Sequence, residues 1–424
     1  MLNLTKKLIA PLAAVVGLTG MAFEVQATPA FARQMDMNCF SCHNQSVPML
    51  NSFGRQFKLS GYTMTSGNKS MITGGDLGLS IPVAINAGIG VKSTYTSNDA
   101  AGARSNLTIP AGSAIMIGGK VAENMGANVL VGNDGIVHMQ VAYSRPMASG
   151  NAGLSYYGTM GHGPFIAVES NNTGLHKELQ MFDSSARTNA VQSRGLGLGK
   201  GPASGLTAFY GGYGLKAAVG VWSLGFNNIN SNGGVDTDGG MGNLYRLTYD
   251  TPTVAGWNFT VGAFGVSGVH EGTTAKLFEN TGVPFLAAPW SAAVNEHEVT
   301  SNGFDLQAQG KIAGIDTQVV LTRVSDYELE IRPLAAPPAF YNSIDTAATS
   351  LEMQLMPTSA WGIRLGYMTS TNNAVIFNAD TITTSYGINY NYADNVRFSL
   401  ESSTQDPDAG TSNTQTQLTT IVAF

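Results

Sequence analysis

The sequence contains little charge, little cysteine and few long apolar runs. Charged residues make up 12% of its 424 residues, about half the share usual in globular domains. Beyond residue 27 no run of 18 apolar residues occurs, which excludes transmembrane helices after that point. The net charge of −6 gives no basis for a nucleic-acid partner. Low charge together with 51 glycines fits a β-sheet wall with one apolar and one polar face. A soluble β-helix or β-sandwich would share this composition.

The N-terminus has the three parts of an export signal. Lys6 and Lys7 supply positive charge, and residues 8–23 form an apolar run that Pro11 interrupts. Val25-Gln26-Ala27 then gives a small-residue cleavage site. We therefore expect residues 1–27 to be a signal peptide, with an uncleaved anchor as the alternative.

The only two cysteines lie close together, in Cys39-Phe40-Ser41-Cys42-His43. A disulfide closing so short a loop would stabilise the fold little. The pattern C-x-x-C-H is that of covalent haem attachment. Two thiols form thioethers to the haem, and the adjacent histidine can be the proximal iron ligand. The motif predicts one haem c on Cys39 and Cys42 with His43 as ligand. A redox dithiol and a zinc site are the alternatives.

The residues after the motif predict a short helix. Leu50, Phe53 and Phe57 share one face, and Gly61 is placed to end it. This face would cover the haem or pack on the rest of the protein. Met64 is the candidate distal iron ligand, and an open position is the alternative. The competing side chains are Met37, Met49, Met71, His138 and His162.

Residues 73–424 read as segments in which apolar and polar residues alternate. Trp361, Ile363 and Leu365, for example, alternate with Gly362 and Arg364. A period of two predicts strands of a sheet with one apolar face. If the sheet is a membrane barrel, four basic residues should face its lumen: Arg246, Lys311, Arg364 and Arg397. Lipid should then contact Tyr245, Leu247, Phe398 and Leu400.

Three features favour a membrane barrel over a soluble sandwich. The segments have about ten residues, as a tilted strand needs to cross a bilayer. Aromatic residues recur near segment ends. Phe424 ends an alternating segment that includes Leu418 and Val422. The predicted fold is all-β: an antiparallel transmembrane barrel of about 16 strands in residues 73–424, preceded by a small, partly helical c-type haem segment in residues 28–72.

Three stretches lack clean alternation and are expected to be long loops, either extracellular or folded into the lumen. They are His162 to Ser204, Glu271 to Asn302, and Asp326 to Thr349. His270 with Glu271, and Glu296-His297-Glu298, could bind a metal cation. Solvated loop charges are the simpler interpretation of both.

The haem segment resembles the fused outer-membrane cytochrome–porins associated with extracellular iron oxidation. The resemblance covers about 35 residues, and Met35-Asp36 departs from the Thr-Gly pair of that family. The matching residues are Pro29, Phe31-Ala32-Arg33-Gln34, the Cys39-to-His43 motif, Pro48, Leu50, Phe53-Gly54-Arg55, Phe57-Lys58-Leu59 and Gly61-Tyr62.

This resemblance implies an electron conduit in the bacterial outer membrane. It would take electrons from extracellular Fe(II) or another donor and pass them to a periplasmic cytochrome, as an iron(II):cytochrome-c-type oxidoreductase. Independently of the resemblance, chains this short rarely fold unaided and the apolar helix face needs a partner, so we expect Pro29 to Met71 to sit inside the barrel or at its periplasmic mouth and to plug the pore. Two alternatives are a passive diffusion porin with a structural haem segment and a barrel-tethered haem peroxidase or sensor.

Overall fold

The computed structural model of the chain describes most of the segment from residue 30 to residue 423. Its ranges are 30–43, 50–65, 71–74, 79–82, 87–98, 105–109, 114–132, 135–161, 163–165, 188–191, 198–199, 202–224, 240–273, 294–333, 342–374, 377–378, 380–393 and 396–423. The expected signal peptide and the terminal Phe424 lie outside the described residues. Among those described, no helix is long and apolar enough to cross a membrane.

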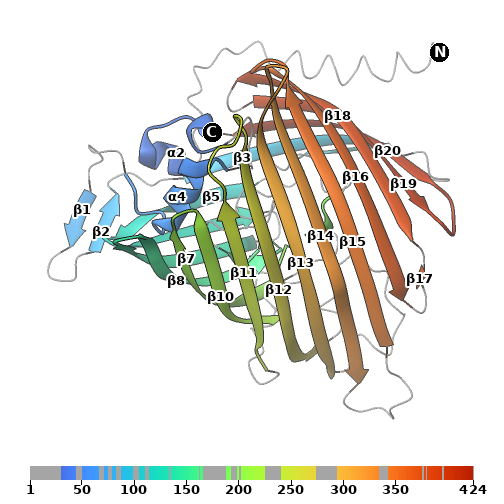
Figure 1. Cartoon of the computed structure of the whole chain (residues 1–424), viewed down its shortest axis with the longest axis horizontal. Coiled ribbons are helices and arrows are strands. Elements are labelled where there is room, and N and C mark those ends of the chain that lie inside the picture. The colour runs from blue at the N-terminus through green and yellow to red at the C-terminus, as the bar shows by residue number, and fades with distance from the viewer. Residues whose placement is uncertain are drawn as a thin grey trace.

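Sixteen strands of the described chain form a closed antiparallel barrel (Figure 1). Each strand pairs with its neighbour in sequence, and β20 pairs with β3 to close the ring. The strands are β3 (Ala87–Asn98), β5 (Ala114–Ala122), β6 (Met125–Gly132), β7 (Gly135–Met147), β8 (Gly150–Met160), β9 (Pro202–Gly212), β10 (Leu215–Leu224), β11 (Gly242–Asp250), β12 (Asn258–Thr273), β13 (Val294–Ile312), β14 (Ile315–Pro333), β15 (Asn342–Met356), β16 (Trp361–Ala374), β18 (Thr381–Ala393), β19 (Val396–Pro407) and β20 (Asn413–Ala423). The predicted strand number is confirmed.

Seven short elements accompany the barrel. Four are short strands: β1 (Met71–Gly74), β2 (Leu79–Pro82), β4 (Asn106–Thr108) and β17 (Phe377–Asn378). Three are helices: α2 (Ala30–Met35), α3 (Cys39–Cys42) and α4 (Ser52–Leu59). The helices lie at one end of the barrel, as Figure 1 shows.

The short turns between strands gather at that same end. Tyr213-Gly214 joins β9 to β10, and Ala313-Gly314 joins β13 to β14, each with two positive φ angles. Two successive residues of positive φ define a type I′ turn, whose twist matches that of an antiparallel pair. We call this the short-turn end, and the opposite end the long-loop end.

The strands alternate as predicted, with polar side chains inside. In β16, Trp361, Ile363 and Leu365 are exposed on the outer face, whereas Arg364 is fully buried. Arg246 on β11 is buried between the exposed Tyr245 and Leu247. The predicted inward faces of Arg246 and Arg364 are thus confirmed. Arg397 also follows the inward alternation of Ser399 and Glu401. Lys311 was expected in the lumen, but it lies beside a short turn, 64% exposed, near Asp316.

Buried ion pairs connect the inner faces of neighbouring strands. Arg246 Nη1 lies 2.5 Å from Asp305 Oδ2, and its guanidinium stands over the Phe264 ring. Arg364 Nη1 lies 2.7 Å from Glu401 Oε1. Charge inside this barrel is therefore largely paired.

The connection between β8 and β9 enters the lumen. The side chains of Thr188 and Asn189 donate hydrogen bonds to the Glu352 carboxylate, at 3.3 and 3.1 Å. The Ala190 N–H donates to Ser350 Oγ at 3.0 Å. Ser350 and Glu352 are buried on the inner face of β15. Of the predicted loop from His162 to Ser204, residues 188–190 lie inside the barrel and Pro202 to Ser204 belong to β9. Most of its other residues lie outside the described part of the chain.

The two other predicted loops are wrong at both ends, where the described residues belong to strands, and their middle parts (274–293 and 334–341) lie outside the described residues. β12 continues to Thr273 and β13 begins at Val294, while β14 runs to Pro333 and β15 begins at Asn342. These strands extend beyond β11, whose pairing with β12 ends at Asn243–Ser267. Where the wall has water on both sides, neither face needs to be apolar. The strands there therefore lack the alternation of apolar and polar residues that predicts a membrane strand.

Candidate haem-attachment site

The C-x-x-C-H motif forms a single helical turn, α3. Asn38 begins it, because its side-chain oxygen accepts a hydrogen bond from the Ser41 N–H at 3.1 Å. The His43 N–H donates to the Cys39 carbonyl at 2.9 Å. Residues three apart in a helix share a face, so the turn places Cys39 and Cys42 on one side, and His43 follows as the C-cap in an extended conformation.

Neither cysteine forms a disulfide, and Cys39 is buried whereas Cys42 is half-buried. Burial raises the pKa of the Cys42 thiol, which favours its protonated form. Among the described residues no group of three or more His, Cys, Asp or Glu side chains converges on one point. A structural zinc ion needs such convergence.

Helix α4 packs directly on the motif. Asn51 caps α4 by accepting from the Gly54 N–H at 2.9 Å. Its N–H donates to the Cys42 carbonyl at 3.0 Å, and its side-chain amide donates to the Ser41 carbonyl at 2.9 Å. A Cβ atom at Gly54 would lie 2.2 Å from the Cys42 carbonyl oxygen. Only glycine at position 54 permits this approach.

The helical segment is bound to inward-facing residues of the barrel. Tyr62 Oη donates to Gln140 Oε1 on β7 at 2.7 Å. Ser144, also on β7, donates to the Leu59 carbonyl at 2.5 Å. Gln309 on β13 donates to the Leu50 carbonyl at 3.4 Å. The segment therefore lies inside the barrel at its short-turn end, as Figure 1 also shows.

One carboxylate adds charge to this attachment. Asp250, the last residue of β11, has Oδ2 3.3 Å from Arg55 Nε of α4. The same oxygen accepts from Lys216, and Thr260 donates to Oδ1 at 2.7 Å. Arg55 and Asp250 are mostly enclosed, at 12% and 21% exposure. A partly buried ion pair whose carboxylate is also hydrogen-bonded to other residues holds its geometry better than a surface pair.

Aromatic packing supplies the apolar contact. Phe31 of α2 stacks on Tyr62 with ring centroids 4.9 Å apart, and Phe57 of α4 meets Phe31 edge-on at 5.1 Å. On the barrel wall, glycines make room for this cluster: Gly118 faces the Phe31 ring and Gly211 faces Leu59. Phe57 thus packs towards the barrel core, which favours the packing alternative for the predicted helix face.

The candidate distal ligands lie in different environments. Met64 is partly buried against the apolar cluster that contains Phe57 and Tyr62, and its carbonyl accepts from Gln34 at 2.6 Å. Met37 is exposed, and His138 is buried on β7. Met49, His162 and the side chain of Met71 lie outside the described residues.

The residues present fit a covalently attached haem. Two cysteines that form no disulfide stand on one helical turn, and His43 follows directly as its C-cap. Asn38, Asn51 and the close approach at Gly54 hold this turn in place. Thioether attachment requires reduced thiols at this spacing. The sequence reasoning missed both asparagine caps, although an asparagine before a helical turn is a recognisable start signal. No sequence signal identifies Gln140, Ser144, Asp250 or Gln309 as the barrel residues that bind the haem segment.

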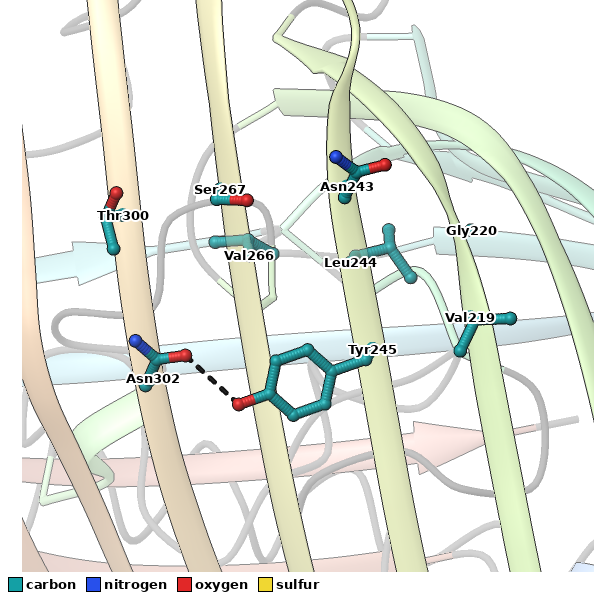
Figure 2. Close-up of a pocket in the computed structure, with 9 residues that line it drawn as sticks. All are labelled: Val219, Gly220, Asn243, Leu244, Tyr245, Val266, Ser267, Thr300 and Asn302. Atoms are coloured by element: carbon teal, nitrogen blue, oxygen red, sulfur yellow. Dashed lines mark hydrogen bonds between the residues drawn. The ribbon is translucent and has the colours of Figure 1, made fainter.

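A cleft of about 330 Å³ lies elsewhere, on the outer face of β10 to β13. Figure 2 shows Tyr245 reaching towards Asn302, and its hydroxyl donates to Asn302 Oδ1 at 3.1 Å. Val219 and Tyr245 are exposed there. This cleft opens away from the lumen and belongs to the outer surface of the wall.

The barrel is similar to solved outer-membrane proteins. The outer membrane channel DcaP of Acinetobacter baumannii aligns with a TM-score of 0.52 at 12% identity, over 84% of this chain and 99% of that one. In-vitro folded OmpT, an outer membrane protein of Vibrio cholerae, aligns with a TM-score of 0.50 at 13% identity, over 80% and 97%. No family model and no curated protein matches the sequence.

The fold defines the class of protein. A closed, even-stranded barrel with an apolar outer band is the architecture of bacterial outer-membrane porins, and the chain is a porin-like protein of the bacterial outer membrane. In such barrels short turns face the periplasm and longer loops face the outside. The Cys39–His43 turn accordingly lies near the periplasmic end, and β12 to β15 extend towards the exterior.

Proposed function

We propose that this protein is an outer-membrane electron conduit. One haem c, attached through Cys39 and Cys42 with His43 as proximal ligand, would receive electrons from an extracellular donor, Fe(II) foremost, and deliver them to a periplasmic cytochrome. The observation that carries the proposal is the position of the C-x-x-C-H turn, which is bound inside a membrane barrel through Gln140, Ser144, Asp250 and Gln309.

The attached haem supplies reversible one-electron chemistry. The protein would hold this haem at a fixed place within the barrel. The bilayer core is about 30 Å thick, and electron tunnelling falls exponentially with distance, so a redox group within the wall divides one long transfer into shorter ones. Asn51 and Gly54 hold the motif against α4, and Asp250 with Arg55 holds α4 against the wall.

The barrel geometry imposes a condition on the donor. On β13, Gln309 binds the haem segment, whereas Val294 is the first residue of the strand, at its exterior end. The 15 residue steps from one to the other span about 50 Å along the strand. An electron cannot cross that distance in one step, so the donor enters the lumen from outside. Ferric product formed in the lumen, on the exterior side of the haem segment, would remain outside the cell.

A passive diffusion porin is the second candidate, because the fold matches that of outer-membrane channels. Two segments bound inside the lumen disfavour it. The haem segment is bound at one end of the barrel, and residues 188–190 are bound to the inner face of β15. Both would obstruct solute.

The test uses the full mature protein, purified with its haem in detergent. Anaerobic Fe(II) should reduce the haem, seen as sharpened visible absorption bands, and a soluble c-type cytochrome should then reoxidise it. A Cys42→Ala variant should lose covalent haem and this reduction together. A haem that remains oxidised in excess Fe(II), together with ion conductance as large as that of an open porin, would favour the diffusion porin.

A further inference from the structure

The wall that extends beyond the membrane brings two distant histidines together. β12 and β13 pair without a break from Asn258–Gln309 to Thr273–Val294, and within this ladder His270 stands directly opposite His297. In an antiparallel pair, opposite residues have Cα atoms about 4.5–5.5 Å apart and share a face of the sheet. Although 26 residues separate the two histidines in the sequence, strand pairing makes their positions direct neighbours on the wall.

The alternation of the two strands identifies the face. Phe264 and Val266 of β12, and Val299 and Ser301 of β13, are buried on the inner side. Positions 270 and 297 continue this series by even steps, so both belong to the inner face. The neighbours of position 270 on that face of β12 are Gly268 and Gly272, which carry no side chain to occupy the space beside a bound ion.

The pair lies outside the bilayer. His297 is 15 residues from Ile312, the end of β13 at the short turn, whereas a membrane strand needs about 9–11 residues. The pairing of β12 with β11 also stops at Ser267, three residues before His270. The two positions therefore stand on the extracellular extension, where a cation can arrive through water.

The outer face of the same extension concentrates negative charge. Three cross-strand pairs place acid opposite acid: Glu271–Glu296, Glu298–Glu330 and Glu328–Asp345. Arg332 stands opposite Glu296 on the other side, so these positions carry six acidic residues against one basic residue and keep a net negative charge. Their field reaches across one sheet thickness, which is within a Debye length of about 8–10 Å. It raises the local concentration of cations at the histidine pair.

We propose that His270 and His297 bind a divalent first-row transition-metal cation on the extracellular wall of the barrel. Imidazole is the common ligand for this class, from Fe(II) to Zn(II). The two histidines, directly opposite each other in the strand pair, would supply two ligands, and water would supply the rest. The site is independent of the haem, and its binding can be measured without any electron transfer.

The binding experiment uses the haem-loaded full chain in detergent, purified without a histidine tag. Calorimetric titration with Zn(II) at pH 7 should give one ion per chain, and Co(II) should give ligand-field absorption bands. Loss of an outer-shell partner alone costs about 10- to 100-fold in metal affinity. His270→Asn and His297→Asn should each weaken binding by at least that much. Lowering the pH below about 6 should release the ion, because protonated imidazole does not ligate.

Two controls make the result decisive. His176→Asn removes a histidine of the chain between β8 and β9 and should leave Zn(II) affinity unchanged. The double variant His270→Cys, His297→Cys should form a disulfide, which tests the juxtaposition itself. Unchanged Zn(II) affinity in both single variants would overturn the proposal, and so would failure of the double variant to cross-link. Metal binding without haem reduction by Fe(II) would contradict the conduit and leave this site standing.

Discussion

Arg55 of the haem segment and Asp250 of β11 form an ion pair with Nε and Oδ2 3.3 Å apart. The two residues are far apart in sequence and belong to different parts of the molecule, an internal helix and the barrel wall. Asp250 also accepts from Lys216 and Thr260. A single carboxylate therefore connects α4 with three strands at the periplasmic end.

Replacing Asp250 should loosen this attachment. Asp250→Asn leaves Arg55 and Lys216 without their shared anion, and hydrogen bonds to charged groups of this kind contribute about 1.5–3 kcal/mol. Thermal unfolding in detergent should show that loss. Lys311→Gln is the matched control, because the Lys311–Asp316 pair is largely exposed and should contribute less than about 1 kcal/mol. Equal effects of the two substitutions would show that Asp250 does not anchor the segment.

Covalent haem should depend on both cysteines. Cys42→Ala should abolish the haem stain that survives a denaturing gel, or leave a weak single thioether, because one of the two thioethers can no longer form. Ser41→Ala keeps the spacing of the thiols and should keep the stain. A Cys42→Ala protein that stained as strongly as the parent would refute the attachment.

Gly54 should be required for attachment of the haem as well. In Gly54→Ala the new Cβ would lie 2.2 Å from the Cys42 carbonyl oxygen, so α4 or the motif must move. We expect a lower haem content per barrel, measured by absorbance against protein. Ser52→Ala, at an exposed position in the first turn of the same helix, should have little effect. Full haem content in Gly54→Ala would mean that the close contact has no role in maturation.

Removal of the internal segment should open the barrel. Deletion of residues 29–71 takes away the helices bound to Gln140, Ser144 and Gln309. A 16-strand barrel without them would have an aqueous lumen, so conductance in planar bilayers should rise and reduction by Fe(II) should disappear. Equal conductance with and without the segment would contradict the plug.

The buried pair Arg246–Asp305 should show strong coupling. Both side chains are completely enclosed, and removing one partner of a buried pair costs about 3–5 kcal/mol. Arg246→Met alone should therefore destabilise the barrel strongly, whereas Arg246→Met with Asp305→Leu should recover most of the loss. Denaturant unfolding of the single and double variants measures this coupling. Additive losses would show that the two charges act independently.

The sequence determined the parts of this protein that depend on local pattern. The period of two predicted a barrel wall and the inner faces of Arg246 and Arg364, because alternation is a property of one strand. The spacing of Cys39, Cys42 and His43 predicted a haem motif, because that chemistry needs only neighbouring residues. The number of residues divided by the usual length of a strand with its loop predicted about 16 strands.

Tertiary structure decided what depends on pairing between distant segments. The extensions of β12 to β15 were read as loops, since strands bathed in water on both faces show no apolar alternation. Their register places His270 opposite His297, which no local pattern encodes. The barrel partners of the haem segment, Gln140 and Asp250 among them, were likewise invisible in the sequence. A polar residue inside a barrel looks the same in sequence whether it faces water or binds a plug, and only the closed wall brings its partner within reach.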